Sequence, residues 1–188
     1  MSTGYQIKEQ DKLYYLTFQV VYWIDIFTRK RYRDILIESL KYSQENKGLE
    51  IFAYVVMSNH VHLIVRSDTE NLSQTIGDIK KFTSKKIINS IKEEPESRRE
   101  WMLFMFERAA KKHKRNKKYQ LWTHENHAIH LYSDKFIKER LMYIHDNPVK
   151  AGIVENAEDY LYSSARNYAS MDAILNIETL TFTWITYT

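Results

Sequence analysis

Two histidines two positions apart are the residues whose types and spacing most clearly suggest chemistry. His60 and His62 belong to the second of two short apolar runs, 51–57 and 60–65, whose β-branched and aromatic residues predict a pair of strands. Because side chains alternate between the faces of a strand, both imidazoles should lie on one face. Two imidazoles placed side by side could hold a metal ion. The same short pattern also suits a half-exposed polar face over an apolar one.

A second pair of reactive side chains is predicted on a helix. Ser133 is a good N-cap for a helix over 134–146, and Pro148 should end it. Tyr143 and Asn147 lie one helical turn apart on one face, and we expect Asn147 at the frayed helix end. The phenol could attack a phosphate while the amide helps to hold a metal. A tyrosine packed on the sheet and an asparagine that caps the helix would explain the same residues.

The elements that must position these side chains follow in the order strand, helix, strand, strand, helix, helix, strand, helix. This order predicts an α+β fold on a ferredoxin-like plan, an antiparallel sheet with helices packed on one face and one helical insertion. Gly48 is expected to end the first helix. The predicted strands cover 13–23, 51–57, 60–65 and 119–129, and the predicted helices cover 29–46, 71 or 73 to about 91, 101–112 and 134–146.

The composition is that of one globular domain. The chain has 188 residues, of which 44% are hydrophobic. It has no cysteines, which excludes disulfides and thiolate metal sites and is consistent with a reducing cytoplasm. The first residues contain no apolar signal core, and no apolar run reaches the roughly 18 residues that a membrane span requires. We therefore expect a cytoplasmic protein with no membrane partner.

Positive charge is concentrated in one part of the chain. The net charge is only +4, but residues 79–118 carry 14 Lys or Arg and 5 Glu, so the remainder is net negative. A basic segment on an otherwise acidic chain suggests a polyanionic partner. A solvated helix face of mixed charge would account for the same residues. The stretch 108–118 is the most basic part.

Two longer motifs stand out in the sequence: Val55-Val-Met-Ser-Asn-His-Val-His-Leu-Ile64 and Tyr143-Ile-His-Asp-Asn-Pro-Val-Lys-Ala-Gly152, the second followed by Tyr160-Leu-Tyr-Ser-Ser164. They resemble the motifs of the REP-associated tyrosine transposases, where REP stands for repetitive extragenic palindrome. These belong to the HUH (His-hydrophobic-His) single-tyrosine transposases of the insertion-sequence-200 type. The order and distance of the motifs agree with that family, and the resemblance indicates an HUH domain over 11–168 and an extension of unknown role over 169–188.

The resemblance implies a role for each candidate residue. His60 and His62 match the paired metal-binding histidines, Tyr143 matches the nucleophile, and Asn147 matches the residue that completes the metal site, where some relatives carry Gln. With phosphate oxygens and water as further ligands, this set suits Mg²⁺ or Mn²⁺. The implied enzyme cleaves and rejoins single-stranded hairpin DNA through a 5′-phosphotyrosine intermediate, in DNA transposition or recombination.

The DNA partner implied by the resemblance gives the basic segment a role in binding phosphates. The family implies a monomer or a homodimer. A non-catalytic or domesticated DNA-binding regulator on the same fold is the alternative. An RNA phosphoesterase with twin His-x-Thr/Ser motifs is disfavoured, because none of the seven histidines has Ser or Thr two places on. The expected DNA contacts are Lys80, Lys81, Lys85 and Lys86.

Overall fold

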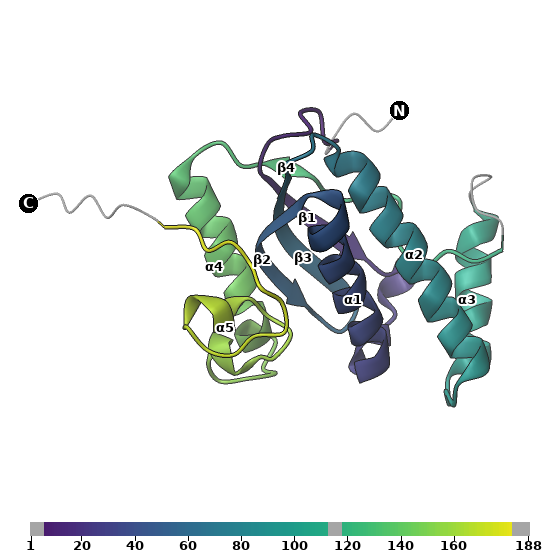
Figure 1. Cartoon of the computed structure of the whole chain (residues 1–188). Coiled ribbons are helices and arrows are strands. Elements are labelled where there is room, and N and C mark those ends of the chain that lie inside the picture. The colour runs from purple at the N-terminus through teal and green to yellow at the C-terminus, as the bar shows by residue number, and fades with distance from the viewer. Residues whose placement is uncertain (1–5, 113–117, 182–188) are drawn as a thin grey trace, which may run out of the picture.

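A four-stranded antiparallel sheet forms the centre of the molecule in the computed structural model (Figure 1), which describes residues 6–112 and 118–181. The strands lie in the order β2-β3-β1-β4, so the two central strands, β1 and β3, are far apart in sequence but paired. A tight turn joins β2 to β3. The strands are β1 (Tyr14–Gln19), β2 (Leu49–Val56), β3 (His60–Ser67) and β4 (Ile129–His130).

The helices follow the predicted order, and the α+β, ferredoxin-like plan is confirmed. Gly48 ends the first helix in the left-handed conformation, with φ at 62°, as predicted. One helix is inserted between the second helix and the last strand. None of the described helices is long and apolar enough to span a bilayer. The helices are α1 (Lys30–Lys47), α2 (Leu72–Glu93), α3 (Arg99–Lys111, the insertion), α4 (Asp134–Lys150) and the short α5 (Ala165–Tyr168).

The two faces of the sheet have different partners. Phe18 is fully buried on the face that α1 and α2 cover, where the ammonium of Lys80 from α2 lies over its ring. Tyr15 and Thr17 alternate with Phe18 and therefore point to the other face. There Tyr15 contacts Tyr143 of α4, with ring centres 6.4 Å apart. The prediction that helices pack on one face of the sheet therefore holds for α1 and α2. Helix α4 lies against the opposite face.

The free edge of β2 is covered by the C-terminal part of the chain. Ser164 donates its backbone N–H to the carbonyl of Tyr54 at 2.9 Å, which extends the sheet by a short irregular segment. Covering an edge in this way removes a template for unwanted strand pairing. Within the extension expected over 169–188, Leu175 is buried, so the described part of that extension packs on the domain.

The first strand is shorter than predicted. We expected a strand over 13–23, but β1 ends at Gln19, and a 3-10 turn (Val21–Trp23) follows. Tyr22 and Trp23 have φ values of 55° and 57°, in the left-handed region. A periodicity of apolar residues cannot reveal such a turn, because the aromatic side chains still satisfy a strand pattern.

The fourth strand is also shorter than predicted. Within 119–129 the chain touches the sheet at two places, the bridge from Trp122 to Val20 and the beginning of β4 at Ile129. Between them the backbone leaves the strand conformation, and His127 has a φ of 42°. The segment therefore runs beside β1 as a loop rather than as a continuous strand.

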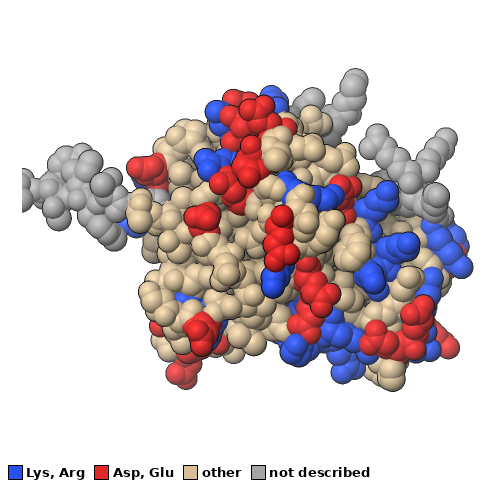
Figure 2. All heavy atoms as spheres, in the orientation of Figure 1, with Lys and Arg blue, Asp and Glu red and all other residues tan. Residues whose placement is uncertain are grey.

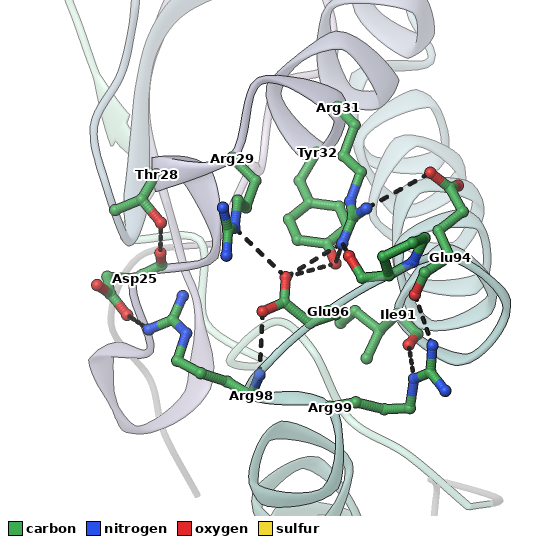
Figure 3. A network of polar contacts seen from close by, with 11 residues as sticks. Asp25, Thr28, Arg29, Arg31, Tyr32, Ile91, Glu94, Glu96, Arg98 and Arg99 are labelled. Atoms are coloured by element: carbon green, nitrogen blue, oxygen red, sulfur yellow. Dashed lines mark hydrogen bonds and ion pairs between the residues drawn. The ribbon is translucent and has the colours of Figure 1, made fainter.

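A buried carboxylate fixes the inserted helix to α1 (Figure 3). The side chain of Glu96 is fully buried and accepts hydrogen bonds from the Tyr32 hydroxyl at 3.1 Å and from the Arg98 backbone at 3.2 Å. Burial raises the pKa of Glu96, but these hydrogen bonds and the nearby Arg29 and Arg31 outweigh it and leave the pKa lowered. Arg98 also binds Asp25 at 2.6 Å, so the network holds the segment that follows Trp23.

Candidate metal and nucleophile site

The two histidines lie side by side on β3, as predicted from the strand periodicity. Their ring centres are 4.7 Å apart, and both rings point to the face of the sheet that α4 covers. His62 is only 5% exposed, whereas His60 is half-buried near the strand end. The histidine pair therefore faces α4 and does not form a solvated polar surface.

The protonation of His60 follows from its neighbour in the chain. Nδ1 of His60 lies 2.7 Å from the side-chain oxygen of Asn59, and an amide oxygen can only accept a hydrogen bond. The proton of the neutral ring therefore resides on Nδ1, and Nε2 keeps its lone pair for a ligand. A polar partner that fixes the tautomer in this way is typical of metal-ligating histidines.

His62 has a hydrogen-bonded side and an orphaned side. Its Nδ1 lies 2.8 Å from the hydroxyl of Tyr15 and 3.0 Å from the hydroxyl of Thr17 on β1. Its Nε2 is buried and has no hydrogen-bond partner among the described residues. A buried polar atom without a partner is costly, and a metal ion would satisfy it. The residues present thus fit a divalent metal that suits nitrogen ligands.

Burial keeps both rings in the neutral form that binds metals. Desolvation, with smaller effects of His60 and Arg140, lowers the pKa of His62 to about 3. Desolvation also lowers the pKa of His60. Both imidazoles are therefore neutral at neutral pH. Arg140 lies over the ring of Tyr15, 5.2 Å from its centre, and brings positive charge to this face.

Tyr143 faces the histidine pair from α4. Its ring lies edge-on to His62, with centres 5.3 Å apart, and 40% of the residue is exposed. The predicted N-cap is present, because the Ser133 hydroxyl accepts a hydrogen bond from the Phe136 N–H at 3.4 Å. One chain supplies both halves of the site, and the phenol can be reached from solvent.

The end of α4 differs from the prediction. The helix does not stop before Pro148 but continues to Lys150. Gly152, whose φ is 67°, belongs to its C-terminal cap. Gly152 N–H donates to Val149 O and Ile153 N–H to Pro148 O, each at 2.9 Å, which is a Schellman cap. Proline is tolerated in this last turn because only one backbone hydrogen bond is lost.

Asn147 is therefore part of a regular helix rather than a frayed end. Its amide nitrogen donates to the carbonyl of Tyr143 at 3.3 Å. Among the described contacts, its side chain meets neither His60 nor His62. The structure thus brings Tyr143 and the two histidines together and places Asn147 one turn beyond, with its side-chain oxygen not engaged in a described hydrogen bond.

Acidic ligands are absent from this part of the described chain. Residues 6–112 and 118–181 contain no group of three or more His, Asp or Glu side chains that could hold a metal. A metal at this site would therefore be bound by the two imidazoles, a neutral oxygen and external ligands. His145, two residues from Tyr143 on the same helix, faces away from the site, because its Nε2 lies 2.8 Å from the Ser164 hydroxyl.

The four predicted DNA contacts fall into two groups. Lys80 points inward, where its ammonium donates to the Thr123 carbonyl at 2.7 Å and to Asn126 Oδ1 at 2.6 Å. Desolvation lowers the pKa of Lys80 to about 8. The structure therefore gives Lys80 a structural role in place of the expected phosphate contact. The other three, which are exposed on α2, are Lys81, Lys85 and Lys86.

Positive charge gathers on the side of the molecule formed by α2 and α3 (Figure 2). The patch agrees with the basic segment expected over 79–118 and contains some acidic side chains. Part of the most basic stretch, residues 113–117, lies outside the described residues.

Four residues around the site were missed by the sequence analysis. Tyr15, Thr17, Asn59 and Arg140 contact or flank the histidines and Tyr143. Asn59 stands next to His60 in the chain and could have been inferred from that position. Tyr15 and Thr17 could not, because their role depends on the pairing register of β1 with β3, which places Thr17 opposite His62.

The site thus consists of a histidine pair on an α+β sheet, with the buried Nε2 of His62 unpartnered among the described residues, opposite a tyrosine on a helix. The family model of the IS200-like transposases matches residues 10–147, which is most of the described domain. The chain belongs to that family, as the motifs predicted.

One solved structure has a similar fold over nearly its whole length. It is a REP-associated tyrosine transposase bound to a REP hairpin, with a TM-score of 0.63 and 19% sequence identity. The alignment covers 97% of this chain and 96% of that one. A search of the curated proteins found no match.

Proposed function

We propose that this protein cleaves and rejoins single-stranded DNA through a covalent bond to Tyr143. The observation that carries the proposal is the edge-on contact between Tyr143 and His62, whose Nε2 is buried without a partner. A solvent-accessible phenol beside a neutral imidazole that can bind a metal is the arrangement that a phosphotyrosine mechanism needs.

His60 and His62, with Asn147 as third ligand, would hold Mg²⁺ or Mn²⁺. The chemistry that such an ion supplies when bound is withdrawal of charge from the non-bridging oxygens of a phosphate. Asn59 and the hydroxyls of Tyr15 and Thr17 orient the two rings. The short distance between the rings favours one shared ion over two separate ones.

Tyr143 is the nucleophile in this proposal. Its phenol oxygen forms an ester with the 5′ phosphate, the bond from phosphorus to the 3′ oxygen breaks, and that oxygen leaves as a 3′ hydroxyl. A free phenol titrates near pH 10, so its proton must be removed as the bond forms. Because the product is again a phosphate ester, a second 3′ hydroxyl can reverse the reaction and rejoin strands without ATP.

The substrate that we propose is a single-stranded DNA hairpin, which places the chain in the REP-associated branch of its family. The similar solved structure is bound to a REP hairpin, which supports this choice. The exposed Lys81, Lys85 and Lys86 supply positive charge for phosphates. Because one chain contains both halves of the site, a monomer suffices. A cytoplasmic location stays a prediction.

The test is formation of a covalent adduct. The protein is incubated with Mn²⁺ and labelled hairpins from the repeats of its source genome, and adducts are detected after denaturing electrophoresis. The native protein and the control Tyr42→Phe, which alters an exposed tyrosine on α1, should form the adduct. Tyr143→Phe should form none. An adduct with Tyr143→Phe would disprove the assignment of the nucleophile.

The alternative, a regulator that binds DNA without cutting it, has a distinct outcome in the same experiment. Hairpins would be bound with an affinity that falls with salt, but no hairpin would become covalently attached to the native protein. That result would exclude the proposed mechanism and keep the DNA partner.

A further inference from the structure

Two adjacent aromatic residues lie in an unfavourable backbone conformation next to the histidine pair. Tyr22 and Trp23 have φ values of 55° and 57°, a region that bulky residues rarely occupy. Residues held in this region cluster at functional sites. The turn keeps both rings at the surface, since Tyr22 is 38% and Trp23 57% exposed.

The surroundings of this turn hold it in place. Asn59 donates its side-chain N–H to the Trp23 carbonyl at 3.2 Å, and Val21 N–H donates to the Leu121 carbonyl at 2.9 Å. Directly after the turn, Asp25 binds Arg98 in the network shown in Figure 3. The rings are thus exposed by a rigid support and not by a loose loop.

The turn is joined to the candidate metal site. The ring of Trp23 lies edge-on to His60, with centres 5.9 Å apart. Asn59 bonds both residues, because its oxygen accepts from His60 Nδ1 and its nitrogen donates to the Trp23 carbonyl. Trp23 is therefore within reach of a DNA strand whose phosphate lies at the histidines.

A hollow beside the turn has the chemistry of a nucleotide site. It has a volume of about 420 Å³ and includes Gln19, the partner of His60 across the strands, and Tyr22 in its lining. The ammonium of Lys112 lies over the Tyr22 ring, 5.2 Å from its centre. The hollow thus combines an aromatic surface, hydrogen-bonding side chains and the positive charge of Lys112, and its lining also includes the acidic Glu125.

We propose that Tyr22 and Trp23 form a stacking platform for unpaired bases next to the phosphate that Tyr143 attacks. Aromatic rings accept the face of any base, and a nearby cation favours the adjoining phosphate. This platform would bind the single-stranded flank of the substrate and set the position of the strand at the site. The inference rests on the proposed function, because it names how that substrate is held.

The test compares two substrates of equal charge. One is a DNA hairpin with a single-stranded oligothymidine flank of about 12 nucleotides, within the range of known binding-site sizes. The other carries an abasic flank of the same length. Affinity is measured by fluorescence anisotropy in EDTA with the Tyr143→Phe protein, so no cleavage occurs. Stacking is worth about 5-fold to 100-fold in affinity, and we expect this preference for the flank with bases.

The variants distinguish the effect of an aromatic ring from the effect of side-chain size. The double variant Tyr22→Leu/Trp23→Leu keeps apolar side chains but removes both aromatic faces, and it should bind both hairpins equally. Trp23→Phe should retain most of the preference. The matched control is Tyr42→Leu on α1, since Tyr42 is also 57% exposed, and it should behave as the parent protein. Thermal unfolding of each variant establishes that it is folded.

Three results would overturn the inference: a parent protein without preference for bases, an undiminished preference in the Tyr22→Leu/Trp23→Leu double variant, or no binding to either hairpin. The last result would also remove the proposed function. If the preference is present but the native protein forms no adduct with Mn²⁺, the platform stands and the proposed mechanism fails. The two proposals are therefore tested separately.

Discussion

The ring of Tyr143 meets the ring of His62 edge-on, with centres 5.3 Å apart, although 81 positions separate the two residues in the sequence. This contact joins α4 to the face of the sheet on which side chains of β1 and β3 surround His62. Because His62 turns its second nitrogen toward Tyr15 and Thr17, its orphaned Nε2 is the part left for a ligand. The relationship makes several properties of the site measurable.

Asn59 should control the affinity for metal without being a ligand. Asn59→Ala removes the acceptor that keeps the proton of His60 on Nδ1. Loss of such a partner costs roughly 10-fold to 100-fold in metal affinity. We expect this loss for Mn²⁺, measured by isothermal titration calorimetry. The control Asn46→Ala alters an exposed asparagine of α1 and should bind as the native protein. Equal affinity of both variants would mean that Asn59 does not support the site.

Asn147 should behave as a ligand through its carbonyl oxygen. Asn147→Ala is expected to lower the Mn²⁺ affinity by about tenfold, the effect of losing one strong polar contact. Asn147→Gln keeps the carbonyl group at the same helical position and should retain most of the affinity. The same titrations decide the matter: if the alanine variant binds Mn²⁺ as tightly as the native protein, Asn147 is not a ligand.

Lys80 and Lys85 should differ although both are lysines of α2. Lys85→Ala removes an exposed charge, so the slope of log affinity for hairpin DNA against log salt should fall by about 0.7–0.9. Lys80→Met leaves Thr123 O and Asn126 Oδ1 without their donor and should cost about 1–3 kcal/mol of unfolding free energy.

These two effects are measured by salt-dependent binding and by urea unfolding of each variant. A smaller salt slope in folded Lys80→Met would mean that its ammonium reaches DNA after all. An unchanged slope in Lys85→Ala would remove that residue from the proposed interface.

His145 should make the stability depend on pH. Burial lowers its pKa to about 4, while the unfolded chain takes up the proton near the ordinary value of 6.5. Acidification below pH 6.5 therefore favours the unfolded chain, and by pH 5 the loss from this residue is about 2 kcal/mol. His145→Gln, which can still bond Ser164, should lose that much less stability than the native protein between pH 7.5 and 5.

The measurement is urea unfolding in EDTA at both pH values. His60 and His62 titrate in both proteins, so only the difference between them reports on His145. Parallel losses in the native and variant proteins would contradict the assignment.

Short-range patterns predicted much of this architecture. The alternation along a strand put His60 and His62 on one face, the helical repeat put Tyr143 and Asn147 one turn apart, and Gly48 ended its helix. The motifs identified the family, which the family model confirms. These features depend on residues a few positions apart, so local geometry is enough to predict them.

Features that depend on distant partners were missed or misjudged. Helix α4 passes through Pro148 because Gly152 and Ile153 cap it further on. Lys80 looked like a surface cation, but the loop after Trp122 approaches it and takes its ammonium as a donor. The left-handed turn at Tyr22 is imposed by neighbours from other parts of the chain.

The sequence by itself determined which residues could do chemistry and on which face of which element each lies, because these properties repeat with the period of the backbone. Only the tertiary structure decided that Tyr143 meets His62, that Tyr15 and Thr17 orient the His62 ring, and that Trp23 lies beside His60. Those contacts arise from strand register and from the packing of α4 on the sheet, which no local pattern encodes.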